Sequence, residues 1–177
     1  MKTLRNPLLI AIAVLVISSA RGADSDAAKK DLTLLHGEWS MVSGTADGLT
    51  MSEEIRKQMK RVCQGNETTT TMGDQVFLKA KITIDPSKKP KTINYQMTEG
   101  PNKGETQLGI YEVDGKTFKT CFSKPGAERP ADFTSKPGDS RTCSVWKREK
   151  SPAEPAQKIT SIVTSFLSLK NDSTFVA

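Results

Sequence analysis

Short stretches in which apolar and polar residues alternate recur along the middle of the chain. In 76–84, every even-numbered position is apolar, and Lys or Thr fills most of the positions between. In 92–98, Ile93, Tyr95 and Met97 alternate with polar residues. A period of two is typical of β-strands with one buried and one wet face. We therefore expect both stretches to be strands.

The segment 107–122 predicts a hairpin. Asp114-Gly115 has the composition of a two-residue turn, because Gly adopts positive φ at little cost. Counting outwards from this turn pairs Val113 with Lys116, Tyr111 with Phe118, and Leu108 with Cys121. The pattern leaves open which face of the hairpin points inward. Further strands are expected in 38–43, 68–71 and 141–150.

The stretch 51–61 instead carries the signals of a short helix. Ser52 is a suitable N-cap, and two glutamates follow at the positive end of the helix dipole. The basic residues Lys57, Lys60 and Arg61 lie at the other end. Ile55 and Met59 share one face, which would dock the helix on the domain.

The expected elements number about eight strands, joined mostly by short turns, with one helix after the first strand. Closing such a sheet on itself removes its exposed edges. The pattern therefore predicts an all-β, eight-stranded antiparallel up-and-down barrel. A two-sheet β-sandwich is the alternative.

The chain ends differ in character from the middle. Residues 1–22 have basic residues, an apolar run over 8–17 and small residues near a cut after Ala20 or Gly22, which is the layout of a secretory signal peptide. A polar lead-in (23–31), the barrel domain (32–150), and a linker with an amphipathic tail (151–177) follow. We expect an exported protein, periplasmic or extracellular, with no transmembrane span in the mature chain.

The formal charge of +6 comes from 26 basic and 20 acidic side chains. Removal of the signal would take Lys2, Arg5 and Arg21 with it and leave 23 against 20, a net charge of +3. This excess is small and spread along the chain, so we expect no binding to nucleic acid.

Three segments of the predicted domain resemble a known family. They are "LHGEWSMVS" (35–43), "DPSKKPKTINYQMTEGPNKGETQLGIYEVDGKTFKTCF" (85–122) and "SKPGAERPADFTSKPG" (123–138). They resemble a lipocalin-like domain of uncharacterised function that is expanded in planctomycete bacteria, and the likeness runs from about residue 34 to 150. The resemblance implies a small antiparallel barrel in exported proteins and implies no activity.

Within the wider lipocalin group, Gly37-Glu38-Trp39 resembles the G-x-W motif of the first strand. The resemblance implies that Trp39 closes the barrel floor beneath a basic residue of the last strand. Lys147 and Arg148 are the candidates for that residue. A cation over an indole ring stabilises such a floor.

The segment between Cys121 and Cys143 contains the tetrapeptide SKPG twice. Pro125-Gly126 and Pro137-Gly138 each suit the central positions of a type II turn. Two such turns predict a compact Ω-loop, with Phe133 pinning it onto the barrel mouth as a lid. If strands 118–122 and 141–147 pair across the loop, Cys121 and Cys143 come within bridging distance. Three pairings of the three cysteines are open, as is the fully reduced state.

No constellation of residues in the chain supports catalysis. His36 is the only histidine and lies beside no nucleophile motif, so we expect no enzyme, no metal site and no cofactor. The leading hypothesis is a barrel that binds a small apolar or amphipathic molecule. A non-catalytic interaction module for an envelope protein is the alternative. The candidate lining residues are Tyr95, Met97, Tyr111, Phe118, Phe122 and Phe133.

Overall fold

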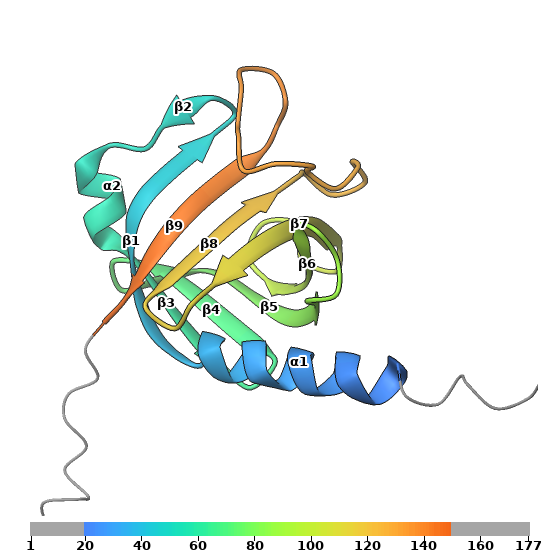
Figure 1. Ribbon diagram of the computed structural model, residues 1–177. Coiled ribbons are helices and arrows are strands. Elements are labelled where there is room, and N and C mark those ends of the chain that lie inside the picture. Colours follow the sequence, from blue (N-terminus) through green and yellow to red (C-terminus); the bar gives the residue numbers. More distant parts are fainter. Residues whose placement is uncertain (1–19, 150–177) are drawn as a thin grey trace, which may run out of the picture.

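The computed structural model describes residues 20–149 (Figure 1). Its helices are α1 (Ala20–Leu35) and α2 (Glu53–Gln58). Its strands are β1 (Gly37–Ala46), β2 (Leu49–Thr50), β3 (Met59–Gln64), β4 (Glu67–Met72), β5 (Gln75–Asp85), β6 (Lys91–Glu99), β7 (Thr106–Val113), β8 (Thr117–Phe122) and β9 (Thr142–Arg148). The predicted signal peptide falls largely, and the predicted tail wholly, outside the described residues.

Eight of these strands form a closed antiparallel barrel. Each strand from β3 to β8 pairs with the next along the chain, β1 pairs with β3, and β1 also pairs with β9. The two-residue β2 is added to the end of β1. The predicted up-and-down barrel with a short helix after its first strand is confirmed, and the β-sandwich alternative is wrong.

One end of the barrel is closed by α1, which lies across it in Figure 1. Leu35, at the end of α1, is fully buried, and its carbonyl accepts a 2.9 Å hydrogen bond from Trp39 Nε1. Asp31 is also buried, and its Oδ2 accepts from Lys91 Nζ and Tyr111 Oη, both at 2.7 Å. The segment expected only to be a polar lead-in is therefore part of a helix that helps form the barrel floor.

Arg148 completes this floor from the last strand. Its Cζ lies 4.2 Å from the centre of the Trp39 ring, and its guanidinium donates to the carbonyls of Leu34, His36 and Gly115. Lys147 is exposed on the outer side of β9. The basic residue expected over Trp39 is thus Arg148 rather than Lys147. Gly37 has φ +122°, and a Cβ there would lie 2.4 Å from Arg148 Nη1, so this position requires glycine.

The predicted helix over 51–61 is only partly correct. Ser52 is the N-cap, since its side chain accepts from the Ile55 N–H, but α2 ends at Gln58. The next residues form β3, in which Met59, Arg61 and Cys63 are buried and the residues between them are exposed. Pairing of β3 with both β1 and β4 outweighs the helical signals, because it satisfies the backbone on both sides.

The hairpin of β7 and β8 exists, but its predicted register is wrong by two residues. Val113 pairs with Phe118, Tyr111 with Thr120, and Ile110 with Cys121. The connection is longer than a two-residue turn because Asp114 Oδ1 accepts from the Lys116 and Thr117 N–H groups. A shift of two leaves each side chain on its face, and Tyr111 and Phe118 point inward.

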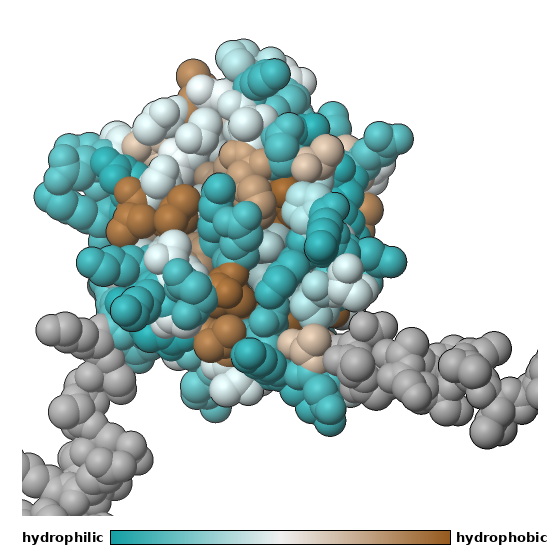
Figure 2. All heavy atoms as spheres, in the orientation of Figure 1, coloured by the Kyte–Doolittle hydropathy of each residue, from teal (hydrophilic) through white to brown (hydrophobic). Residues whose placement is uncertain are grey.

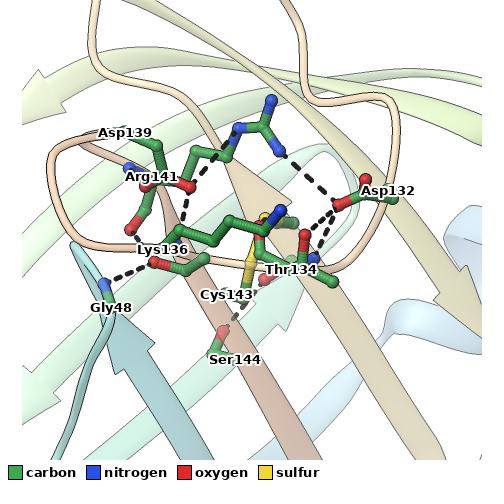
Figure 3. The surroundings of a disulfide bond; sticks show 11 residues. Gly48, Asp132, Thr134, Lys136, Asp139, Arg141, Cys143 and Ser144 are labelled. Atoms are coloured by element: carbon green, nitrogen blue, oxygen red, sulfur yellow. Dashed lines mark hydrogen bonds and ion pairs between the residues drawn. A yellow bond between two sulfur atoms is a disulfide. The ribbon is translucent and has the colours of Figure 1, made fainter.

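The loop between β8 and β9 contains both expected turns. The Ala127 N–H donates to the Lys124 carbonyl and the Asp139 N–H to the Lys136 carbonyl, each at 3.2 Å. Gly126 and Gly138 have φ +77° and +85°, as a type II turn requires after proline. β8 and β9 pair with each other, and Cys121 lies opposite Cys143. A disulfide joins these two cysteines (Figure 3).

The loop does not cover the barrel mouth. Arg129 fastens its first half to the outer side of β6 and β7 by donating to the Ile93 and Gly109 carbonyls and to Asn94 Oδ1. Its second half is held to the β1–β2 turn, where Asp47 Oδ1 accepts from the Gly138 and Ser140 N–H groups, 2.9 Å each. Figure 3 shows the polar bonds that bind this half around the disulfide. The predicted lid is wrong.

On one face of the barrel, polar and apolar residues are interspersed. On the face drawn in Figure 2, hydrophobic residues lie in small separate groups among hydrophilic ones. Neither α1 nor α2 is long and apolar enough to cross a membrane.

Candidate functional site

A cavity of about 330 Å³ occupies the half of the barrel away from α1. No residue of α1 lines it, and the fully buried Trp39 and Phe118 lie beneath it rather than around it. Its outer rim includes Ile55, Met72 and Phe77, whose side chains are 43%, 40% and 41% exposed. The interior of this barrel is therefore packed at the floor and hollow towards the mouth.

Methionine dominates the apolar wall of the cavity. All the methionines except Met1 line it: Met41, Met51, Met59, Met72 and Met97. Gly44 makes room for two of them, because a Cβ there would lie 2.6 Å from Met51 Sδ and 2.9 Å from Met41 Sδ. Unbranched, polarizable thioether side chains adapt readily to the shape of a bound molecule. The wall therefore suits a flexible apolar group.

A group of hydroxyls on one side of the cavity is already satisfied by neighbours. Thr120 Oγ1 and Ser144 Oγ are 2.9 Å apart and share a hydrogen bond. Trp146 Nε1 donates to the same Ser144 Oγ at 2.8 Å. These three residues face the cavity but have little hydrogen-bonding capacity to spare.

Arg61 differs from them, because most of its hydrogen-bonding capacity is unused. Its side chain is inside the barrel and only 5% exposed, with Cζ 4.3 Å from the centre of the Trp146 ring. Nη1 donates a 2.5 Å hydrogen bond to Tyr95 Oη, whereas Nε is buried without a partner. Thr70, paired with Arg61 across β3 and β4, also has a buried hydroxyl without a partner.

Among residues 20–149, no carboxylate balances the charge of Arg61. None of the cavity-lining residues is Asp or Glu, and no ion pair among residues 20–149 includes Arg61. Buried charges in proteins are normally paired, since desolvation of an unpaired ion is costly. Contacts with the rings of Trp146, Phe118 and Tyr95 offset part of that cost.

Tyr95 is the polar partner that Arg61 does have. Burial raises the pKa of Tyr95 to about 12, although the nearby Arg61 charge acts in the opposite direction. The phenol therefore stays protonated at neutral pH. Its oxygen accepts from Arg61, and Thr68 is its other hydrogen-bonding neighbour.

The unpaired thiol of the protein lies deeper than this layer. Cys63 is buried two residues along β3 from Arg61 and donates weakly to Thr68 Oγ1 at 3.5 Å. Burial raises the pKa of Cys63, so the thiol is neutral and unreactive.

The predicted lining residues fall into three groups. Tyr95, Met97 and Phe122 line the cavity. Tyr111 and Phe118 point inward but are fully buried in the floor, where they pack with Trp39. Phe133 lies outside the barrel, with Lys119 Nζ 4.2 Å from its ring centre, because the loop is anchored to the outer wall.

Arg61 is the site residue that the sequence analysis missed. Its basic neighbour Lys60 and the acidic start of α2 made the segment resemble the end of a helix. The alternation Met59-x-Arg61-x-Cys63 was the signal that could have placed it inside a strand.

The other candidate chemistries find no support in the described residues. His36 is exposed between α1 and β1, and residues 20–149 contain no group of three His, Cys, Asp or Glu side chains that could hold a metal ion.

Comparisons of the chain with protein-family models, with curated proteins and with solved structures find no match.

Proposed function

We propose that this protein is an exported, non-enzymatic lipocalin-like barrel that binds one small apolar or amphipathic molecule in its interior. The observation that carries the proposal is the cavity of about 330 Å³ with its wall of methionine and aromatic side chains. This volume is at the lower end of the range for small-molecule sites, which are mostly apolar with a few polar groups.

Two features support the export of the protein. Residues 1–22 have the composition of a secretory signal. The Cys121–Cys143 disulfide is of a kind that persists in oxidising compartments. The resemblance of residues 34–150 to a lipocalin-like domain of exported proteins is included in this proposal and agrees with export.

Native mass spectrometry tests the proposal on mature protein purified gently from its own envelope. A reproducible mass excess that disappears on denaturation is expected. In parallel, the uncharged fluorescent probe N-phenyl-1-naphthylamine should bind the purified chain at one site.

A pair of variants locates that site. Leu78→Trp should abolish probe binding, because Leu78 lines the cavity and a larger side chain fills it. Val62→Trp is the matched control, since Val62 is exposed on the outer face of β3. A bare polypeptide mass together with no probe binding by the wild type would disprove a ligand-binding interior.

The second candidate function is a non-catalytic module that binds an envelope protein. It is favoured by exposed apolar side chains near the mouth, of which Leu49 is 74% exposed. Leu49→Lys separates the two functions. A ligand binder keeps probe binding after this substitution, whereas an interaction module that uses this surface loses cross-linking to its partner in envelope extracts.

A further inference from the structure

We infer that the ligand of this cavity is an amphiphile with a single carboxylate, whose head group lies against Arg61 and whose chain extends past the methionines to the mouth. The inference rests on the proposed function and specifies its ligand class. It assigns Arg61 and Thr70 as the residues that recognise the head group, and Tyr95 as the residue that positions Arg61.

The unpaired charge of Arg61 indicates an anionic head group. Arg61 is buried in the cavity wall and lacks an acidic partner among the residues that the structure describes. One bound carboxylate supplies the missing charge and brings the net charge of the site to zero. A phosphate monoester with two negative charges would exceed what a single guanidinium neutralises, which is why we commit to a carboxylate.

The wall around Arg61 also has hydrogen-bond donors without partners. A guanidinium has five N–H donors in a planar fork that matches a carboxylate, and the structure gives Arg61 a single bond, to Tyr95. The Thr70 hydroxyl, buried without a partner, faces the same layer from β4. A carboxylate in this layer therefore has donors from two side chains, Arg61 and Thr70.

The side chains between Arg61 and the mouth indicate the path of the ligand's alkyl chain. One inward position closer to the mouth, Met59 pairs with Met72, just as Arg61 pairs with Thr70. Two residues along a strand span about 6.7 Å, so an apolar layer begins one short step above the head group. Met72 belongs to both that layer and the exposed rim. The order from charged to apolar to open matches an amphiphile that enters tail last.

Titration calorimetry with three probes of equal chain length tests the inference on the wild-type protein. These are decanoate, decanol and decylammonium. We expect decanoate to bind about 10- to 100-fold more tightly than decanol, the range for hydrogen bonds to a charged group. Decylammonium should bind most weakly, because its charge repels Arg61. The advantage of decanoate should disappear as the pH falls below the pKa of its carboxyl group.

Two variants of the same position remove the charge. Arg61→Gln and Arg61→Met should each bring decanoate to within about threefold of decanol. Lys81→Gln is the control, because it removes the same charge from an exposed position on the outer side of β5. The control should keep the full preference for decanoate.

Each outcome separates the inference from the function on which it rests. Equal binding of decanoate and decanol by the wild type would overturn the inference and leave the ligand-binding function in place. Tighter binding of decyl phosphate than of decanoate would overturn the choice of a carboxylate. If no probe binds, including N-phenyl-1-naphthylamine, the proposed function fails and the inference with it.

Discussion

Arg148 and Arg61 both lie over a tryptophan ring, with Cζ 4.2 Å from the centre of the Trp39 ring and 4.3 Å from that of Trp146. Arg148 donates to three backbone carbonyls at the floor of the barrel. Arg61 makes one hydrogen bond, to Tyr95, in the wall of the cavity. Each of the three guanidinium nitrogens of Arg148 donates to a carbonyl, whereas only one nitrogen of Arg61 has a partner. Equal stacking thus accompanies different roles, and the count of satisfied donors distinguishes them.

The surroundings of the two arginines differ in the same way. Around Arg148 the barrel is filled by α1, by Trp39 and by buried aromatic residues. Around Arg61 it is hollow and lined by flexible methionines. We conclude that stability is concentrated at the floor and binding in the upper half.

The largest effect is expected from a matched pair of leucine truncations. Leu35→Ala should lower the free energy of unfolding by about 3 kcal/mol, because Leu35 is fully buried on the floor and leaves a void. Leu78→Ala should cost about 1 kcal/mol, since Leu78 already borders empty space. Urea unfolding of both variants measures the difference. Equal losses would contradict the division between floor and cavity.

A second pair compares the arginines directly. Arg148→Met should cost about 2 kcal/mol of stability, because three carbonyls lose their charged donor. Arg61→Met should be neutral or stabilising by up to about 2 kcal/mol, since it removes a buried unpaired charge. Thermal and urea unfolding without ligand give both values. A large loss for Arg61→Met would mean that Arg61 serves the fold.

The third prediction concerns alkaline pH. Because burial raises the folded-state pKa of Tyr95 from 10.0 to about 12, its contribution is complete below pH 10. Above pH 10 the unfolded chain loses the proton while the folded protein retains it, so stability falls by about 2 kcal/mol towards pH 12. Tyr95→Phe should remove this part of the decline. Urea unfolding of the wild type and Tyr95→Phe at pH 9 and 11.5 measures how far the free energy of unfolding falls in each protein. The two proteins would show equal falls if Tyr95 were solvated.

The smallest effect is expected from an exposed ion pair. Lys57→Ala breaks the 2.8 Å contact with Glu53 on α2, where both side chains are more than half exposed. Such pairs contribute about 0.3–0.5 kcal/mol and weaken with salt. Unfolding at low and high ionic strength measures the contribution. A loss above about 1 kcal/mol would show that α2 contributes more to the fold than its burial indicates.

Most of the fold could be predicted because it depends on local patterns. Apolar–polar patterns and the Asp-Gly turn predicted β5 to β8, and the two Pro-Gly turns and the Ser52 cap have local causes. The hairpin register could not be predicted, because it depends on hydrogen bonds from the Asp114 side chain rather than on the turn dipeptide. The loop position depends on Arg129, whose partners are far away in sequence.

The candidate site could be predicted only in part. Tyr95 and Met97 belong to a strand with clean alternation, so their inward direction followed from the sequence. The depth of Tyr111 and Phe118 in the floor depends on how strands are staggered around the whole barrel. Arg61 was hidden because a charged residue in an inward position contradicts the rule by which inward positions are recognised.

A crystal structure of the protein with decanoate shows directly whether the head group lies against Arg61. We expect the carboxylate within hydrogen-bond distance of the Arg61 guanidinium, with the chain running past Met59 and Met72 to the rim. A carboxylate at the mouth with the chain buried against Arg61, or an empty cavity, would contradict it.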